Sequence, residues 1–318
     1  MKFEYEIKNI ENKIEDLERH SKESNIDFST EINNLKDERD IKLKFLYDNL
    51  TDDQILEVAR HNERPHAIDY INNIFEDFIE IHGDRYYADD NSIITGFAKL
   101  NDIKCAIIAN EKGRTTEEKV YRNFSMPYPD GYRKALRLAK IAEKFSLPII
   151  SFVDTPGAYP GVEAEQRGQA LSIAKNIMEF SHIKTPILSL VIGEGCSGGA
   201  LALAVADRIL MMEYSIFSVI SPEGCSSILF NNIEKTTEMA NSLNISAKKL
   251  YKLGIIDDII SEPIGGAHRN FKSTMINTKN VLFKEISLLI KTDKTELINN
   301  RYKKYRYFDK NNFYEERI

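Results

Sequence analysis

The residues whose types and spacing best suit chemistry form a glycine-rich segment, residues 193–199, called the glycine turn below. It reads Gly193-Glu194-Gly195-Cys196-Ser197-Gly198-Gly199 and follows an apolar run. Glycine lets the backbone turn tightly and approach a ligand closely. If a helix begins at Gly198 or Gly199, its free N–H groups suit an anion, or a carbonyl oxygen that gains negative charge during a reaction. We therefore predict an oxyanion-binding element, in preference to a turn that serves helix packing alone.

The same segment also fits a nucleophile motif. Residues 195–199 match GxSxG, in which a serine stands on a sharp strand-to-helix turn. Histidine and aspartate partners exist downstream: His268, with Asp207, Asp257 or Asp258. A pattern this loose recurs by chance, however, and Ser197 can equally cap the helix. A serine hydrolase using Ser197 is therefore the alternative function.

Two more segments follow apolar runs. Residues 154–161, Asp-Thr-Pro-Gly-Ala-Tyr-Pro-Gly, contain a DxxG like that of GTP-binding proteins, but the chain has no GxxxxGK[ST] and no Gly-Lys dipeptide. We therefore expect a rigid loop that shapes a pocket wall, not a nucleotide site.

Residues 221–225 read Ser-Pro-Glu-Gly-Cys and are expected to lead into a helix. An acidic residue in a first helical turn, such as Glu223, more often interacts with the helix dipole than takes part in catalysis. Cations from Lys112 to Lys134 could meet phosphates or carboxylates, or be solvated.

Short apolar runs that alternate with helical patterns must position these loops. Residues 92–100 and 104–110 predict paired strands, and 130–145 predict a helix. Further strands are expected at 147–153, 185–192, 208–212 and 216–220. Between the first two of these lies a helix with apolar residues at helical spacing: Ala170, Leu171, Ala174, Ile177 and Met178. Successive strand–turn–helix units imply parallel strands and an α/β fold, with ligands at the carboxyl ends of the strands.

Both ends of the chain differ from this pattern. Residues 1–50 carry a narrow apolar seam that predicts two helices, either an antiparallel hairpin packed on the body or a subunit-docking arm. The tail from Asn299 is basic and aromatic without periodicity, which favours a flexible end.

Composition narrows the class of protein. The chain has 318 residues, 42% of them hydrophobic, and a formal net charge of −6, so it has no basic footprint for nucleic acid. The sequence shows no membrane span and an acidic, mixed N-terminus, so we expect a cytoplasmic location. Three separated cysteines and six histidines lack metal-ligand spacing, so no metal is expected on this chain.

Taken in order, the motifs resemble one family. They are Gly113-Arg114-Thr115, Arg122-Asn123-Phe124, Pro127, residues 131–138 (Gly-Tyr-Arg-Lys-Ala-Leu-Arg-Leu), residues 154–161, Gly193-Glu194-Gly195, Ser197-Gly198-Gly199-Ala200-Leu201, residues 220–225 and Gly265-Gly266-Ala267-His268-Arg269. This order is similar to that of the alpha subunits of bacterial-type acetyl-CoA carboxylase carboxyltransferase. The resemblance runs from about Asp40 to Asn270, with a helical arm similar in kind before it.

The resemblance implies a crotonase-like fold, a spiral of ββα units with an N-terminal helical arm. It also implies transfer of a carboxyl group from carboxybiotin, held on the biotin carboxyl carrier protein, to acetyl-CoA, which gives malonyl-CoA for fatty acid synthesis. The implied assembly is α2β2, with a zinc-ribbon beta subunit on the acetyl-CoA side and ATP consumed by the partner biotin carboxylase. A non-catalytic scaffold for the beta subunit is a third interpretation. The implied domains are an arm over 1–50, a carboxyltransferase domain over 36–292 and a tail over 293–318.

Site residues follow by matching position. The backbone N–H groups of Gly198 and Gly199 are the expected oxyanion hole for biotin. The expected pocket wall consists of Gly157, Ala158, Tyr159, Gly195, Ser221, Pro222, Glu223 and Gly224. Two positions depart from the family pattern, because Cys196 and Ser125 stand where glycine is usual. We expect an ordinary backbone conformation at Cys196 and a change confined to a loop at Ser125.

Overall fold

One mixed sheet forms the centre of the molecule. The computed structural model describes residues 1–24 and 26–308. Within this part the strands are β1 (Glu76–Glu80), β2 (Ile93–Leu100), β3 (Ile103–Asn110), β4 (Ile149–Thr155), β5 (Ile187–Cys196), β6 (Arg208–Met212), β7 (Ile216–Ser218) and β8 (Asp258–Ile260). Their order is β1-β2-β3-β4-β5-β6-β8, and β7 pairs with the end of β5. β1, β2 and β3 are antiparallel and the later pairs are parallel, which confirms the predicted α/β class.

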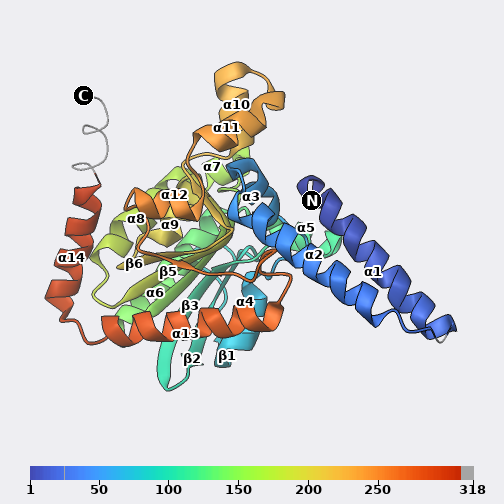
Figure 1. The fold of residues 1–318 in the computed structure, drawn as a ribbon. Coiled ribbons are helices and arrows are strands. Elements are labelled where there is room, and N and C mark those ends of the chain that lie inside the picture. Colours follow the sequence, from blue (N-terminus) through green and yellow to red (C-terminus); the bar gives the residue numbers. More distant parts are fainter. Residues whose placement is uncertain (25, 309–318) are drawn as a thin grey trace, which may run out of the picture.

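Helices cover both faces of this sheet (Figure 1). The helices are α1 (Tyr5–Ser24), α2 (Ser29–Asp48), α3 (Asp52–Ala59), α4 (Ala67–Ile74), α5 (Thr116–Tyr121), α6 (Pro129–Lys144), α7 (Val162–Gln166), α8 (Gln169–His182), α9 (Ser197–Ala204), α10 (Pro222–Phe230), α11 (Thr236–Ser242), α12 (Ala247–Lys252), α13 (Phe271–Leu289) and α14 (Lys294–Tyr307), with 3-10 turns at Lys2–Glu4, Asn123–Ser125 and Ile233–Lys235. Helices α6, α8 and α9 pack on one face, and α4 and α13 pack on the other. None of these helices combines the length and apolar character needed to span a membrane.

The burial of β4 and β5 explains where the site lies. Every residue of both strands is buried, as expected for parallel strands with helices on both faces. Their register pairs Ile149 with Ile187 and Val153 with Val191. The two strands therefore end at the same edge, and the loops that follow them, 154–161 and the glycine turn, lie side by side.

Helix α8 confirms the predicted helix but shows an unexpected face. Part of the predicted apolar stripe points outward, since Leu171 is 73% exposed and Met178 is 56% exposed, whereas Ile177 packs against the core. Polar side chains are buried instead, because Gln169 Nε2 donates to Pro127 O at 2.8 Å and Asn176 is held against α9. Helical spacing predicts a helix with an apolar stripe, but it cannot say whether that stripe faces the body.

The first two helices form the predicted antiparallel hairpin, which projects from the body (Figure 1). Ile10, Ile14 and Ile32 close its seam. At its base, the Tyr47 hydroxyl donates to Glu4 Oε1 at 2.6 Å and to Gly265 O at 3.1 Å. The hairpin therefore has a polar as well as an apolar attachment to the body, and its use as a docking arm stays a prediction.

The tail prediction is wrong over its described part. Residues from Asn299 to Phe308 belong to α14 and the residue after it, and residues 309–318 lie outside the described residues. Arg301 is 1% exposed, and its Nε and Nη2 lie 2.8 and 2.7 Å from the two carboxylate oxygens of Asp207. Its Nη1 donates to Phe180 O at 2.7 Å. A buried, fully bonded arginine fixes this helix to the sheet, a contact that periodicity does not reveal.

We expect Arg301→Met to lower the free energy of unfolding by about 3–5 kcal/mol, because it leaves Asp207 buried without its partner. Urea denaturation followed by circular dichroism measures this change. Lys303→Met, at an exposed position of the same helix, is the matched control and should stay close to wild type. Equal midpoints for the two variants would contradict the anchoring role.

Acid should weaken the fold through His268, whose ring stacks on His61 with centroids 3.9 Å apart. Burial, together with the charges of His61 and Arg269, lowers the pKa of His268 to about 3, whereas an unfolded histidine titrates near about 6.5. Between these values the unfolded chain binds a proton that the folded chain does not, so stability falls as pH falls through this window. His268→Gln should therefore lose less Tm than wild type between about pH 7 and about pH 5. The exposed-site control His20→Gln should match wild type, and an unchanged slope in His268→Gln would contradict the assignment.

Candidate active site

The turn between β5 and α9 differs from the prediction in its boundaries. The expected strand over 185–192 continues to Cys196, and the helix begins at Ser197, before Gly198. The chain continues as strand because β7 pairs with residues 194–196. Cys196 has φ −116°, which confirms the expected ordinary conformation. Ser197 has φ 63°, so the sharp change of direction falls on a serine in the left-handed region.

Gly199 brings the two glycine-containing loops into contact. A Cβ at Gly199 would lie 2.4 Å from Ala158 N and 2.8 Å from Gly157 C, which leaves no room for any side chain. Gly157 itself has φ 140°, a conformation that glycine adopts most readily. Gly198 differs, since a Cβ there would meet only Ile173 Cγ2, at 3.3 Å. The structure thus places Gly157, Ala158 and Gly199 together, as the site prediction requires.

The first N–H groups of α9 have no hydrogen-bond acceptor outside the helix in the described residues, although Gly199 itself is buried. The opening N–H groups of a helix have no acceptor within it. In the described part of the chain, neither Gly198 N nor Gly199 N donates to a group outside α9. Gly198 is half-buried and Ser197 is exposed, so the start of the helix reaches the surface. This arrangement can bind an oxygen that carries or gains negative charge.

A strained turn supports the neighbouring loop. Asn123, Phe124 and Ser125 have φ values of 47°, 52° and 61°, three consecutive residues in the left-handed region. The buried Ser125 hydroxyl donates to Asp154 O, and Thr155 Oγ1 donates to Ser125 O. The change at Ser125 is therefore more than a loop variation, because its side chain bonds the end of β4. Its left-handed backbone also explains why glycine suits this position.

Tyr159 is held on the same side of the site. Its N–H donates to Pro127 O at 3.1 Å, and its carbonyl accepts from Gln169 Nε2 at 2.9 Å. Its ring packs on Tyr128, with centroids 4.5 Å apart. The loop over 157–159 is thus bonded to the preceding turn and to α8, which fixes its position relative to the glycine turn.

Beside these backbone elements lies a network of five charged side chains. Lys112 Nζ lies 2.7 Å from Asp154 Oδ1 and 3.0 Å from Glu194 Oε1. Arg60 joins Glu194 Oε2 at 2.8 Å and Glu223 Oε1 at 2.6 Å. Burial alone would raise the pKa of Glu194, but Lys112 and Arg60 outweigh burial and hold it below its ordinary value. Burial would likewise lower the pKa of Lys112, and the two carboxylates raise it. Both cations stay charged and are occupied by carboxylates.

Three of the other predicted cations are paired with carboxylates within the chain, and Arg122 Nη1 donates instead to the backbone oxygen of Asn91 at 2.8 Å. Arg114 contacts Asp69, Arg133 Nε lies 2.7 Å from Asp84 Oδ2, and Lys134 Nζ lies 2.6 Å from Asp89 Oδ1. The sequence left phosphates, carboxylates and solvent open as partners of these cations. For Arg114, Arg133 and Lys134 the structure shows carboxylates of the protein itself.

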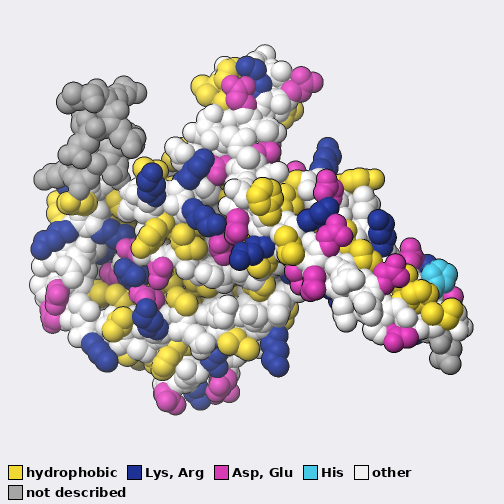
Figure 2. All heavy atoms as spheres, in the orientation of Figure 1, with side chains coloured by type: hydrophobic (Ala, Val, Ile, Leu, Met, Phe, Trp, Pro, Cys, Tyr) yellow, Lys and Arg dark blue, Asp and Glu magenta, His cyan; other side chains and the backbone are white. Residues whose placement is uncertain are grey.

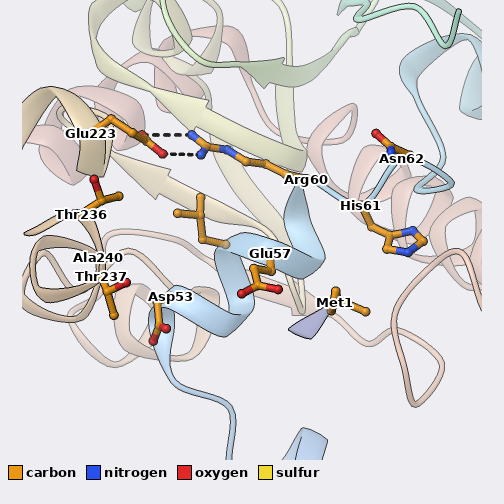
Figure 3. A pocket seen from close by; sticks show the side chains of 11 residues that line it. Met1, Asp53, Glu57, Arg60, His61, Asn62, Glu223, Thr236, Thr237 and Ala240 are labelled. Atoms are coloured by element: carbon orange, nitrogen blue, oxygen red, sulfur yellow. Dashed lines mark hydrogen bonds and ion pairs between the residues drawn. The ribbon is translucent and has the colours of Figure 1, made fainter. Parts of the chain in front are cut away.

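A cavity of about 530 Å³ opens next to this network (Figure 3). It lies between α3, the chain start and α10–α11, and Figure 3 shows the Arg60–Glu223 pair at one edge. Its lining residues are Met1, Asp53, Leu56, Glu57, Arg60, His61, Asn62, Glu223, Thr236, Thr237 and Ala240. Of the predicted wall residues only Glu223 lines it. Gly157, Ala158, Tyr159, Gly195, Ser221, Pro222 and Gly224 lie outside its lining, so this cavity is not the predicted pocket.

The hydrolase alternative lacks its triad. Ser197 does stand on a sharp turn, as a nucleophile would, but His268 stacks on His61 and its Nδ1 has no hydrogen-bond partner among the described residues. The candidate acids are engaged elsewhere: Asp207 binds Arg301, Asp257 binds Lys304, and Asp258 Oδ1 accepts from the N–H of Ile259. A serine nucleophile needs a base that is oriented by a third group, and these residues do not form one.

Sequence reasoning missed Arg60 and gave Glu194 no role. The partners of Arg60 lie 134 and 163 residues along the chain, beyond the reach of any local pattern. Glu194 does stand out in retrospect, as a charged residue inside a buried strand end, where charges are rare unless paired. The described residues hold no cluster of three or more His, Cys, Asp or Glu that could bind a metal.

Comparison with known proteins supports the motif order. A family model described as "Acetyl co-enzyme A carboxylase carboxyltransferase-like" matches residues 1–309. The acetyl-coenzyme A carboxylase carboxyl transferase subunit alpha of Fusobacterium nucleatum is 54% identical over 306 residues, which cover 96% of this chain and 98% of that relative. The chain belongs to this family of carboxyl transferase alpha subunits. Family membership makes it a component of a carboxyltransferase enzyme.

Solved structures agree on the fold. Transcarboxylase 12S aligns with a TM-score of 0.59 at 21% identity, over 72% of this chain and 42% of that chain. The beta subunit of geranyl-CoA carboxylase from P. aeruginosa aligns with a TM-score of 0.57 at 16% identity, over 78% of this chain and 45% of that chain. These alignments confirm the predicted crotonase-like carboxyltransferase fold.

The two glycines of the turn should respond differently to a methyl group. Gly199→Ala places its Cβ against the backbone of the opposing loop, so we expect a loss of about 1–3 kcal/mol in the free energy of unfolding. Gly198→Ala would meet only Ile173 Cγ2, at 3.3 Å and not against backbone, and should stay within about 1 kcal/mol of wild type. Thermal and urea unfolding of the two variants measure the difference. A Gly199→Ala protein as stable as Gly198→Ala would contradict the contact with Ala158.

Proposed function

We propose that the chain forms the carboxybiotin side of an acetyl-CoA carboxylase carboxyltransferase, with the amides of Gly198 and Gly199 as its oxyanion hole. The reaction would move a carboxyl group from carboxybiotin on the biotin carboxyl carrier protein to acetyl-CoA and give malonyl-CoA. One observation carries the proposal: Gly199 lies against residues 157–158, so two free helix-start amides stand beside the loop expected to wall the pocket.

The donor set fits biotin chemistry. Carboxybiotin, when bound, would supply the carboxyl group, and the oxyanion hole would stabilise negative charge on its ureido carbonyl oxygen. Neutral backbone N–H groups stabilise such an oxygen without binding it as a fixed anion, and they need no reorganisation during the reaction. Lys112 and Arg60 are poor candidates for the same task, because both already contact carboxylates. The wall residues would orient the bicyclic ring: Gly157, Ala158, Tyr159, Gly195, Ser221, Pro222, Glu223 and Gly224.

The site is open on its outer side, which supports a pocket shared with another subunit. Ser197 is exposed and Gly198 is half-buried, so the start of α9 faces the surface of this chain. We infer that a beta subunit with a zinc ribbon closes the site and contributes the acetyl-CoA side, in an α2β2 assembly that works with the carrier protein and biotin carboxylase. The division into an arm (1–50), a carboxyltransferase domain (36–292) and a tail (293–318), and a cytoplasmic location, remain predictions.

Coexpression with a beta subunit tests the proposal. The complex should carry out the reverse reaction, from malonyl-CoA to the biotin analogue biocytin, whereas the isolated chain should not. Gly198→Pro should lower this activity by about 100-fold or more, because it removes one oxyanion donor. Proline is tolerated in the first turn of a helix, so the complex should still assemble.

Gly198→Ala, which keeps the N–H, is the matched control and should stay active. Size-exclusion chromatography confirms assembly of each variant. An active Gly198→Pro complex would reject the oxyanion assignment, and full activity in assembled Gly198→Pro and Gly199→Ala together would favour the scaffold interpretation. Turnover by the isolated chain would contradict the shared site.

A further inference from the structure

One guanidinium joins the two sides of the proposed site. Arg60 follows α3, and its Nε donates to Glu194 Oε2 at 2.8 Å within the glycine turn. Its Nη1 and Nη2 donate to Glu223 Oε1 and Oε2, at 2.6 and 3.3 Å. Glu223 belongs to residues 221–224, called the wall segment here. Arg60 therefore connects the end of β5 to the start of α10.

The Glu194 end of this connection is rigid. Glu194 is 4% exposed, and its backbone N–H donates to Asp154 Oδ1 at 2.9 Å. Its second carboxylate oxygen accepts from Lys112 Nζ, which also contacts Asp154. Three strand ends, those of β3, β4 and β5, thus fix the carboxylate that Arg60 holds.

The wall segment is held more loosely. β7 pairs with β5 only as far as Ser218, and within the wall segment Gly224 N donates to Ser221 Oγ, a local bond. In the described residues, the hydrogen bonds that join residues 221–224 to the strand ends come from Arg60. Beyond the wall segment, α10 and α11 project from the body (Figures 1 and 2). Helix α10 carries exposed apolar side chains, with Ile228 at 75% and Leu229 at 65%.

We propose that Arg60 is a positioning residue that sets the distance between the wall segment and the glycine turn. This inference rests on the proposed function, since it assigns a purpose to the spacing of that site. Arg60 would act through Glu223 and Glu194 and need not touch a substrate. The task suits the planar guanidinium, because Nε binds Glu194 while both Nη groups bind Glu223 in a fixed geometry, whereas a lysine ammonium is a point charge without that geometry. The exposed pairing with Glu223 would be worth little as a stability device alone, so its main effect is on geometry.

The test compares variants of the assembled complex with its beta subunit. Arg60→Met should raise the KM for biocytin about tenfold or more, because a small misplacement of a binding wall is costly, and should leave the KM for malonyl-CoA unchanged. Glu223→Gln, which keeps the shape but loses the charge, should raise the biocytin KM less. Arg60→Lys should recover part of the loss. In the double variant Arg60→Met/Glu223→Gln, the biocytin KM should equal that of Arg60→Met, since both changes break one connection.

Lys249→Met is the matched control, because Lys249 Nζ contacts Asp52 at the other end of α3, 2.9 Å away. It removes an ion pair from the same helix and should leave both KM values at their wild-type levels. A second readout is independent of activity: backbone amides of α10 should exchange hydrogen faster in Arg60→Met than in Lys249→Met.

The outcomes separate the two proposals. An inactive wild-type complex would contradict the proposed function, and the hydrogen-exchange comparison would still test the connection made by Arg60. If the wild type is active and Gly198→Pro is not, unchanged biocytin KM and unchanged α10 exchange in Arg60→Met would overturn the positioning role. Equal increases in the KM for biocytin and for malonyl-CoA would also overturn it, because they indicate a general loss of structure.

Discussion

The contact between the Gly199 backbone and residues 157–158 is the constraint on which the rest of the site depends. It is possible because β4 and β5 are adjacent, parallel and in a register that ends both strands at one edge. It also requires that Gly199 carry no side chain, since Ala158 N occupies the place of a Cβ. The supports around it follow from this demand: the left-handed Ser197, the strained turn at 123–125 and the bonds of Gln169 all hold backbone at close range.

The charged side chains beside the site hold its backbone segments in place. The groups proposed to act on a substrate are backbone N–H groups. Two cations, Lys112 and Arg60, stand among three carboxylates, Asp154, Glu194 and Glu223. Because each cation contacts two carboxylates, none offers a free positive charge. Burying such a network is costly unless every member is paired, and here the pairing connects segments from across the chain. The network fixes the positions of the strand ends relative to one another. An apolar core would fix these positions less specifically.

How much of this could be predicted depends on the range of each interaction. The strands at 92–100 and 104–110, the helix over 130–145 and the strand-to-helix transition near Gly198 follow from local patterns, and the structure confirms them with small shifts of their boundaries. The pairings of Arg60 and of Arg301 do not, because each joins residues about a hundred or more positions apart and leaves no periodic signal. The outward position of Leu171 and Met178 on α8 was also beyond prediction, since spacing shows that an apolar stripe exists but not which of its residues pack on the body. The flexible-tail prediction is wrong because α14 packs on the body through the buried Arg301 together with Leu297 and Tyr305, too few apolar residues to give a recognisable pattern.

The close approach at Gly199 also limits how this gene can change. Every amino acid reachable from a glycine codon by one base substitution has a Cβ, and that atom would lie 2.4 Å from Ala158 N whatever else the side chain contains. Conservative and radical replacements therefore meet the same obstacle, and measures of similarity in size or polarity have no meaning there. At the neighbouring Gly198, a Cβ would meet only the Cγ2 methyl group of Ile173, at 3.3 Å. Two identical letters side by side in the sequence thus have different evolutionary freedom, and only the structure distinguishes them.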